Sequence, residues 1–192
     1  MNWSDNAATL FVLMEKLSAR DRQGTEMDPD DGFRAWQNLA LRVHESGGTI
    51  FLIGNGASAS MASHIAADVA KNAGIRTEVF FDLSLLTALG NDIGFADVFS
   101  EPLRLKATAR DLLVAISSSG ESPNIIKGVE AADRLGAAVV TLSAMGGDNR
   151  LRGTGRLNFY LSARTYGEAE TCHAAVLHHW VDLLAAERAR PR

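Results

Sequence analysis

The chain has 192 residues, of which 46% are hydrophobic and 22% charged, a composition typical of one folded globular domain and unlike a disordered or fibrous chain. Its formal net charge is −4 with lysines and arginines scattered, so the sequence offers no basic patch for nucleic acid. No apolar run approaches the roughly 20 residues that span a bilayer and no signal-peptide pattern opens the chain, so we expect a cytoplasmic protein with no membrane partner.

Two helices are expected before any strand. Apolar residues at helical spacing predict one helix from Trp3 to Arg20 and a second from Gly32 to Glu45. The segment between them, Arg20–Asp31, is polar and contains a glycine and a proline, which indicates a connector. We expect residues 1–47 to form the N-terminal helical part of a single domain that spans residues 1–192.

The middle of the chain, residues 48–165, alternates short apolar runs with helical patterns. The strand Thr49–Ile53 leads into the glycine-rich loop Gly54–Ser58 and then a helix over Ser60–Asn72. The same order recurs in the strand Leu112–Ile116, the loop Ser117–Ser122 and the helix Asn124–Leu135. Further strands are expected at Thr77–Phe81, Ala137–Leu142 and Leu157–Leu161.

Continuously apolar strands that alternate with helices are typical of a parallel sheet covered on both faces. We therefore predict an α/β fold, a three-layer αβα sandwich around a five-stranded parallel sheet. A long amphipathic helix over residues 166–188 closes the chain, with Trp180 on its apolar face. Cys172 in that helix is the single cysteine, so no internal disulfide can form, and we expect it to act as a small buried apolar residue.

Both polar loops follow strands of the predicted sheet, where doubly wound folds bind their ligands. The first loop supplies the amide of Asn55, the backbone of Gly56 and the hydroxyl of Ser58, and the second supplies four serines. Hydroxyls and backbone amides without a lysine suit a phosphate ester or a polyhydroxylated chain, so they indicate a sugar phosphate. Serines and glycines also form ordinary turns and helix caps, an interpretation that is weaker for two such loops than for one.

The first loop allows a second interpretation. Gly54–Ala59 fits the G-x-G-x-x-A pattern of a dinucleotide site, and Asp82 follows the next expected strand. This alternative is disfavoured because two helices precede the strand and because 192 residues leave little room for a substrate domain.

Histidines and carboxylates gather on two helices. His64 and Asp68 lie one turn apart on one helix face, where they can bind a metal or simply hydrogen-bond to each other. The terminal helix carries a second group within ten residues: Glu170, His173, His178 and His179. Two carboxylates with two imidazoles form a suitable shell for zinc or another divalent transition metal.

Helix geometry restricts that metal site. Residues eight apart lie about 12 Å apart along a helix axis. Glu170 and His178 can therefore share an ion only if Glu170 precedes the first full turn or if the ligands come from different subunits. Glu170 with His173, three residues apart, is the local alternative.

Several motifs in order resemble the sugar isomerase (SIS) domain, specifically its phosphoheptose isomerase branch, over roughly residues 32–184. They are Gly54–Ser58, His64, Gly90–Asp97, Ile116–Ser122, and Glu170 with His178. The resemblance implies a flavodoxin-like SIS fold and a homotetramer with active sites at subunit interfaces. It also implies zinc in the active site and isomerisation of sedoheptulose 7-phosphate to D-glycero-D-manno-heptose 7-phosphate.

The resemblance also implies roles for individual residues in an aldose–ketose isomerisation through an enediol. Asp68 would be the general base and His178 the general acid, roles that suit a carboxylate and an imidazole. The metal ligands would be His64, Asp68, Glu170 and His178. The sugar phosphate would be bound by Asn55, Gly56, Ser58, Asp92, Ser117, Ser118, Ser119, Ser122 and Glu170.

Three positions depart from the usual pattern of that branch. Ala57 replaces a glycine, Asp68 replaces a glutamate and Glu170 replaces a glutamine. Asp68 has a shorter reach, whereas Glu170 adds a negative charge that can tighten metal binding. The alternative function is a non-catalytic scaffold or regulator of the same fold, similar to the DnaA initiator-associating protein, that binds a protein partner or a sugar phosphate; the presence of His178 favours an enzyme.

Overall fold

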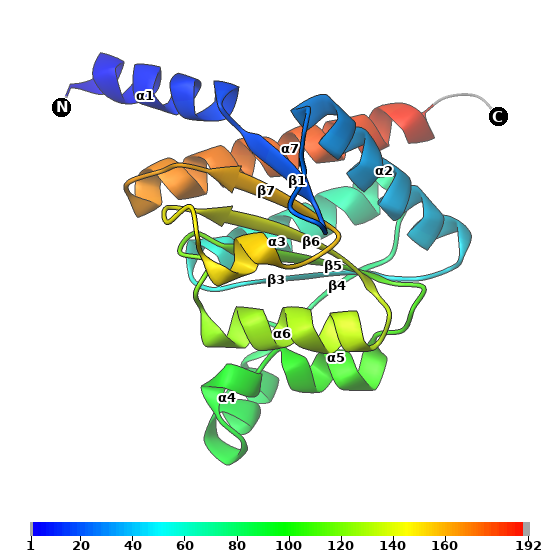
Figure 1. Ribbon diagram of the computed structural model, residues 1–192. Helices are drawn as coiled ribbons and strands as arrows, with labels where there is room; N and C mark the ends of the chain where they lie inside the picture. Colours follow the sequence, from blue (N-terminus) through cyan, green and yellow to red (C-terminus); the bar gives the residue numbers. More distant parts are fainter. Residues whose placement is uncertain (1, 190–192) are drawn as a thin grey trace.

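A seven-stranded sheet forms the centre of the computed structural model, which describes residues 2–189 (Figure 1). The ends of the expected domain, Met1 and residues 190–192, lie outside the described part. The strand order is β2-β1-β7-β6-β5-β3-β4, and the five strands β3 to β7 run parallel to one another. The strands are β1 (Ser18–Asp21), β2 (Glu26–Met27), β3 (Ile50–Gly54), β4 (Thr77–Val79), β5 (Leu112–Ser117), β6 (Ala138–Ala144) and β7 (Leu157–Leu161).

The five predicted parallel strands are confirmed, but the sheet is larger than expected. The first helix ends at Glu15 instead of continuing to Arg20. β1 covers the end of that expected helix and the start of the expected connector, and β2 lies within the connector, so the prediction of two helices before any strand is wrong. β1 pairs antiparallel with β7, with Ala19 opposite Phe159. Only Ala19 of β1 is buried, so this edge strand is stabilised by its pairing with β7 and carries almost no apolar pattern of its own.

Helices cover both faces of the sheet, as predicted (Figure 1). One face packs against α2 (Pro29–Glu45), α3 (Ala57–Asp68) and α7 (Tyr166–Arg188), and the other against α5 (Ser100–Lys106) and α6 (Pro123–Arg134). Successive residues of a strand point to opposite faces, so Leu52 joins the first core and Ile53 the second. This double burial explains why the strands are continuously apolar.

Aromatic rings fill the first core. Trp36 of α2 and Trp180 of α7 are stacked with their ring centroids 4.3 Å apart, and Phe159 of β7 lies against Trp36 at 5.2 Å. Both tryptophans are fully buried, which confirms Trp180 as a core residue. Cys172 is also fully buried, in a small cluster where α7 meets β6 and β7, as predicted.

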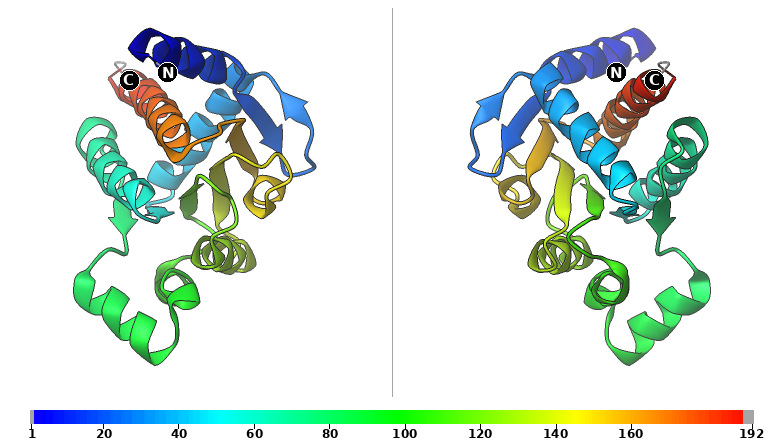
Figure 2. Two further views of the ribbon diagram at one scale, coloured as in Figure 1. Left: turned by 90° about the vertical axis from the view of Figure 1, so that its left-hand side faces the viewer. Right: turned by 90° about the vertical axis from the view of Figure 1, so that its right-hand side faces the viewer.

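Two helices extend from the body of the fold. α1 (Trp3–Glu15) has no buried residue and exposes Trp3 and Phe11, and α4 (Leu83–Asp92) lies apart from the sheet layers and exposes Leu83 (Figure 2). The remaining short helices are a π-helix at Val69–Ala73 and 3₁₀ turns at Phe95–Asp97 (η2) and Arg150–Gly153 (η3). Within the described chain, no helix combines the length and the hydropathy needed to cross a bilayer.

Candidate active site

The glycine loop and the serine loop meet in a pocket at the carboxyl ends of β3 and β5. These strands are neighbours in parallel register, with Gly54 opposite Ile116, so the loops that follow them emerge side by side. The pocket, which we call the serine pocket, has a volume of about 140 Å³. Its lining contains seven predicted binding residues, namely Asn55, Ser58, Ser117, Ser118, Ser119, Ser122 and Glu170, together with Ile116 and Tyr166.

The glycine loop turns tightly into α3. A Cβ at Gly54 would lie 2.6 Å from the carbonyl carbon of Ser58, and Gly56 adopts a positive φ of 54°. This compact turn places Gly56 at the N-cap of α3 and buries Ser58 in the first turn. Gly56 therefore contributes its backbone conformation to the predicted site. It lies at the start of a helix, where free N–H groups favour a bound anion.

A pair of asparagines joins the glycine loop to the helix that follows the serine loop. Asn55 Nδ2 donates to Asn124 Oδ1 at 2.9 Å, and Asn124 Nδ2 donates back to Asn55 Oδ1 at 2.8 Å. Asn124 is buried, and its Oδ1 also accepts the backbone N–H of Ile125. Asn124 does not stand out in the sequence, because an asparagine next to Pro123 at the start of a helix is typical of helix N-termini.

Contacts with the segment that follows β6 fix the conformation of the serine loop. Gly120 has a φ of +67°, and a Cβ there would lie 2.0 Å from Oδ1 of Asn149. The Leu151 N–H donates to the Gly120 carbonyl at 3.0 Å, and the Ala144 N–H donates to the Ser118 carbonyl at 3.1 Å. The segment between β6 and η3 therefore fixes the loop and leads it to the N-terminus of α6.

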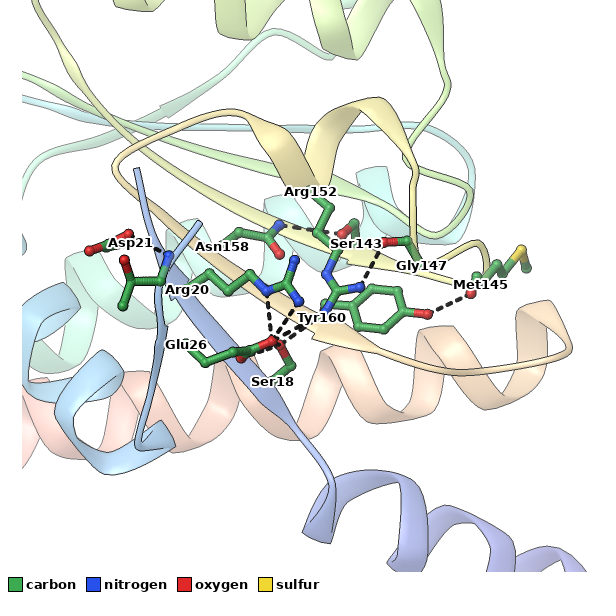
Figure 3. A network of polar contacts seen from close by, with 11 residues as sticks. Ser18, Arg20, Asp21, Glu26, Ser143, Met145, Gly147, Arg152, Asn158 and Tyr160 are labelled. Atoms are coloured by element: carbon green, nitrogen blue, oxygen red, sulfur yellow. Dashed lines mark hydrogen bonds and ion pairs between the residues drawn. The ribbon is translucent and has the colours of Figure 1, made fainter. Parts of the chain in front are cut away.

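A partly buried arginine supports that segment (Figure 3). The Arg152 guanidinium lies 3.8 Å from the centroid of the Tyr160 ring and donates to the Gly147 carbonyl at 2.7 Å. Tyr160 in turn donates its hydroxyl to the Met145 carbonyl at 2.7 Å. Arg152 also donates to Ser18 Oγ at 3.2 Å, so the same side chain attaches the β1–β2 hairpin. Burial lowers the pKa of Arg152 from its ordinary value.

His64, Asp68 and His178 converge between α3 and α7. Each offers one ligand atom, and these atoms all lie within 4.8 Å of one another. His64 Nε2 lies 3.3 Å from Asp68 Oδ2, and the rings of His64 and His178 are 5.2 Å apart. Lys71 Nζ lies 3.8 Å from Asp68 Oδ1. Two imidazoles and a carboxylate with open positions are the donor set of a catalytic metal site, so these residues form a possible metal site.

The structure separates the other candidates from this cluster. Glu170 lines the serine pocket, on the same helix as His178 but two turns earlier, as the spacing indicated. His173 is buried, donates from Nε2 to the Ser143 carbonyl at 3.3 Å, and has its pKa lowered by burial to about 4. His179 is exposed and contacts the Phe33 ring. Asp92 ends α4, accepts a hydrogen bond from Asn91 and does not line the serine pocket within the described chain.

Comparisons with known proteins agree with this geometry. Residues 22–144 match the model of the SIS domain. The chain is 33% identical to the phosphoheptose isomerase of Chlorobaculum parvum over 188 residues, covering 90% of this chain and 88% of that one. It is 31% identical to the phosphoheptose isomerase of Syntrophotalea carbinolica, covering 89% of both. The solved structure of the phosphoheptose isomerase of Neisseria gonorrhoeae superposes with a TM-score of 0.82 at 26% identity, covering 95% of this chain and 96% of that one.

The fold, the serine pocket and these matches define a class of sugar-phosphate proteins, and the chain belongs to the SIS domain family. Within that family it belongs to the branch of the phosphoheptose isomerases, which are enzymes of the isomerase class.

Proposed function

We propose that this protein is a phosphosugar isomerase that interconverts a ketose and an aldose phosphate through an enediol, with sedoheptulose 7-phosphate and D-glycero-D-manno-heptose 7-phosphate as its pair of sugars. One observation carries the proposal: the serine pocket and the histidine–aspartate cluster are built from the same two helices. α3 supplies Ser58 to the pocket and Asp68 to the cluster, and α7 supplies Glu170 and His178. The two sites lie about 12 to 15 Å apart along these helices, so a sugar chain extends from a phosphate in the serine pocket toward the acid–base groups.

The serine loop binds the phosphate in this proposal. Ser117 and Ser118 are buried, and Ser122 caps α6 without a side-chain bond to the helix backbone. The hydroxyls of these serines stabilise a phosphate without any lysine. Asn55 is held by Asn124 so that the sugar hydroxyls meet a fixed polar edge, and Glu170 closes the other side of the pocket.

Asp68 and His178 transfer the protons. Asp68 removes the proton from the carbon beside the carbonyl, and His178 donates a proton to the carbonyl oxygen to give the enediol. Reversal of these transfers on the neighbouring carbon and oxygen gives the isomer, and both groups return to their starting states. Asp68 lies at the end of α3, just before the π-helix Val69–Ala73, and has a smaller exposed fraction than His64.

His64, Asp68 and His178 also fit a zinc ion, one per active site, with Glu170 as a further ligand if a neighbouring subunit brings it close. When bound, zinc would polarise the sugar carbonyl and stabilise the negative charge of the enediolate. The chain's own groups supply the proton transfers, and Asp68 does so between His64 Nε2 at 3.3 Å and Lys71 Nζ at 3.8 Å.

The proposal includes a cytoplasmic homotetramer. Trp3 and Phe11 of α1 and Leu83 of α4 are large apolar side chains exposed on helices that extend from the fold. Burial of such side chains between copies is favourable. Contact through α4 would bring Asp92 of one copy to the pocket of another, which explains why a predicted sugar ligand lies away from the serine pocket of its own chain.

The replacement His178→Ala tests the function, with His179→Ala as the matched control from the same helix. We expect His178→Ala to lower kcat by about a hundredfold or more, because it removes the general acid. Binding of the sugar phosphate, measured by calorimetry, should stay within about twofold. His179→Ala should retain the rate, since His179 faces Phe33 and not the cluster.

Proton exchange between solvent and a panel of C5 to C7 ketose phosphates, followed by NMR, measures turnover and identifies the sugar. Metal analysis of the same preparations should find about one zinc per chain in the wild type and less in His178→Ala. Full exchange in His178→Ala would contradict its assignment as the acid. Absence of exchange with every sugar of the panel in the wild type would contradict an isomerase and favour a non-catalytic protein.

A further inference from the structure

A second, larger pocket lies at the opposite end of the parallel strands from the serine pocket. Its volume is about 890 Å³, within the range of pockets that bind drug-sized ligands. Its walls contain residues that directly precede strands, such as Arg110 before β5, Ala137 before β6 and Arg156 before β7. β5 has six residues, so roughly 20 Å of strand separates its start from the serine loop.

The floor of this pocket is apolar. Leu39 and Val43 of α2 line it together with Leu157 of β7, all from the first core, whereas Val139 of β6 lines it from the core on the other face of the sheet. Each of these side chains is at most 5% exposed, so the floor belongs to the packed core and has a fixed shape. A flat or hydrocarbon part of a ligand can therefore bury its surface here without rearrangement of the protein.

The carboxylates of the pocket already have partners. Asp133 forms two hydrogen bonds of 2.9 Å with the Arg22 guanidinium. Asp111 accepts from the backbone of Thr49 at 2.7 Å and of Thr108 at 2.6 Å. Asp21 accepts from two backbone N–H groups that follow it in the hairpin turn, each at 2.9 Å. Arg22 neutralises Asp133, whereas Asp21 and Asp111 are bonded to uncharged N–H groups and keep their negative charge. With four arginines and three aspartates in its lining, the pocket carries one net positive charge.

Three of the arginines that line the pocket have no acidic partner in the described part of the chain. Arg42, Arg110 and Arg156 form no ion pair with any residue between 2 and 189. Their backbones are nevertheless fixed: the Arg156 N–H donates to the Val139 carbonyl at 2.7 Å, and Arg42 lies in the last turn of α2. A Cβ at Gly48 would lie 2.3 Å from the Arg110 carbonyl oxygen, so that loop is also closely packed. The chain as a whole carries a net charge of −4, which makes this local group of free cations unusual for it.

We propose that this pocket, which we call the arginine pocket, binds an organic phosphate of nucleotide size. Guanidinium groups bind phosphate through paired charge-assisted hydrogen bonds. The phosphates would contact Arg42, Arg110 and Arg156, and the ring or hydrocarbon part would lie on the floor formed by Leu39, Val43 and Leu157. This site is separate from the serine pocket and needs no isomerase activity.

Calorimetry on the full chain tests the proposal with three probes: ADP, adenosine without phosphate, and inorganic pyrophosphate without the ring. ADP should bind more tightly than either part alone, and its affinity should fall as the salt concentration rises. The double replacement Arg42→Gln with Arg156→Gln should weaken ADP binding by about tenfold or more. Arg34→Gln is the matched control, because Arg34 is on the same helix as Arg42 but is paired with Asp31 outside the pocket.

A second control tests whether the two pockets bind their ligands independently. Ser119→Ala changes only the serine pocket and should leave ADP binding within about twofold, and the double arginine variant should retain proton exchange into the sugar. Four results would overturn the proposal: no heat with ADP at millimolar concentration, equal affinity for ADP in the double variant, loss of ADP binding in Ser119→Ala, or adenosine or pyrophosphate binding as tightly as ADP. Melting curves of the variants confirm that each is folded.

Discussion

Gly120 holds the serine loop in a backbone conformation that other residues rarely adopt. Its φ is +67°, and the space where a Cβ would lie is filled by the side chain of Asn149. Asn149 cannot move freely, because its Nδ2 donates to the Ala144 carbonyl at 3.2 Å and to the Gly146 carbonyl at 2.6 Å. The position of the serine hydroxyls therefore depends on a residue without a side chain.

Replacement of Gly120 by alanine should both destabilise the protein and weaken sugar-phosphate binding. We expect a loss of about 2 to 3 kcal/mol in the free energy of unfolding, from the left-handed backbone and the overlap with Asn149. Gly153→Ala is the matched control, since a Cβ at Gly153 meets nothing within 4 Å. Urea unfolding and KM measure the two effects, and an unchanged KM in Gly120→Ala would show that the loop does not need this conformation.

His173 makes stability depend on pH. Burial lowers its pKa to about 4, although the hydrogen bond to the Ser143 carbonyl acts in the opposite direction. Between about pH 6.5 and 4 the unfolded chain takes up a proton on this imidazole, whereas the folded chain does not. The free energy of unfolding should therefore fall as the pH is lowered through this window, by at most about 3 kcal/mol from this group.

Urea unfolding at pH 7.5 and pH 4.5 measures this effect. His173→Gln should show a smaller loss between the two pH values than the wild type, whereas the exposed His179→Gln should lose as much as the wild type. An equal loss in His173→Gln and the wild type would mean that carboxylates alone cause the pH dependence.

Among the secondary-structure elements, the hairpin of β1 and β2 is joined to the rest of the sheet through one strand, β1. β2 has two residues and pairs only with β1, so the attachment depends on β7 and on the polar network around Arg152. Glu26 of β2 lies 3.6 Å from the Arg152 guanidinium and 2.6 Å from that of Arg20. Burial acts to raise the pKa of Glu26, but hydrogen bonds from Arg20 and Ser18 and the charges of both arginines outweigh it and lower the pKa.

Arg152→Met should therefore loosen the hairpin and the segment behind the serine loop together. It removes the contact with the Tyr160 ring and the bonds to Gly147 and Ser18, and we expect a loss of about 2 kcal/mol in the free energy of unfolding. Arg150→Met, two residues earlier with an exposed side chain, should cost less than about 0.5 kcal/mol. Hydrogen exchange should rise at Ala19 and at Asn149, whose N–H donates to the Gly146 carbonyl, in Arg152→Met only; unchanged exchange at both would contradict this role of Arg152.

The sequence predicts the buried parallel strands but not the hairpin of β1 and β2, and the difference has a physical reason. Buried strands such as β3 and β5 are apolar on both faces, so their pattern is strong and their order brings the two loops to one edge. β1 is stabilised by a partner far away in the chain, and such pairing leaves no local signal. The convergence of His178 with His64 depends on how α7 packs on α3, which no spacing within either helix specifies.

For the whole molecule, the apolar surface of α1 predicts the assembly. Leu10 and Leu13 pack toward the cluster around Cys172, whereas Trp3 is 79% and Phe11 62% exposed. Phe11→Asp should shift the protein from the proposed tetramer to smaller species, since a buried carboxylate is costly. Light scattering after size exclusion measures the mass, and Lys16→Glu at the exposed C-cap of the same helix should leave it unchanged. A tetramer that persists in Phe11→Asp would mean that α1 is outside the interface.

The burial of the chain's single cysteine has a practical use. Cys172 is fully buried, and burial raises the pKa of its thiol, so a maleimide should not label the folded wild-type protein. A cysteine introduced at Leu105 of α5, which is 87% exposed and lies outside the proposed contacts of α1 and α4, would then be the sole reactive thiol. A fluorescent dye attached there would follow α5 directly as substrate is added, without prior removal of any native residue.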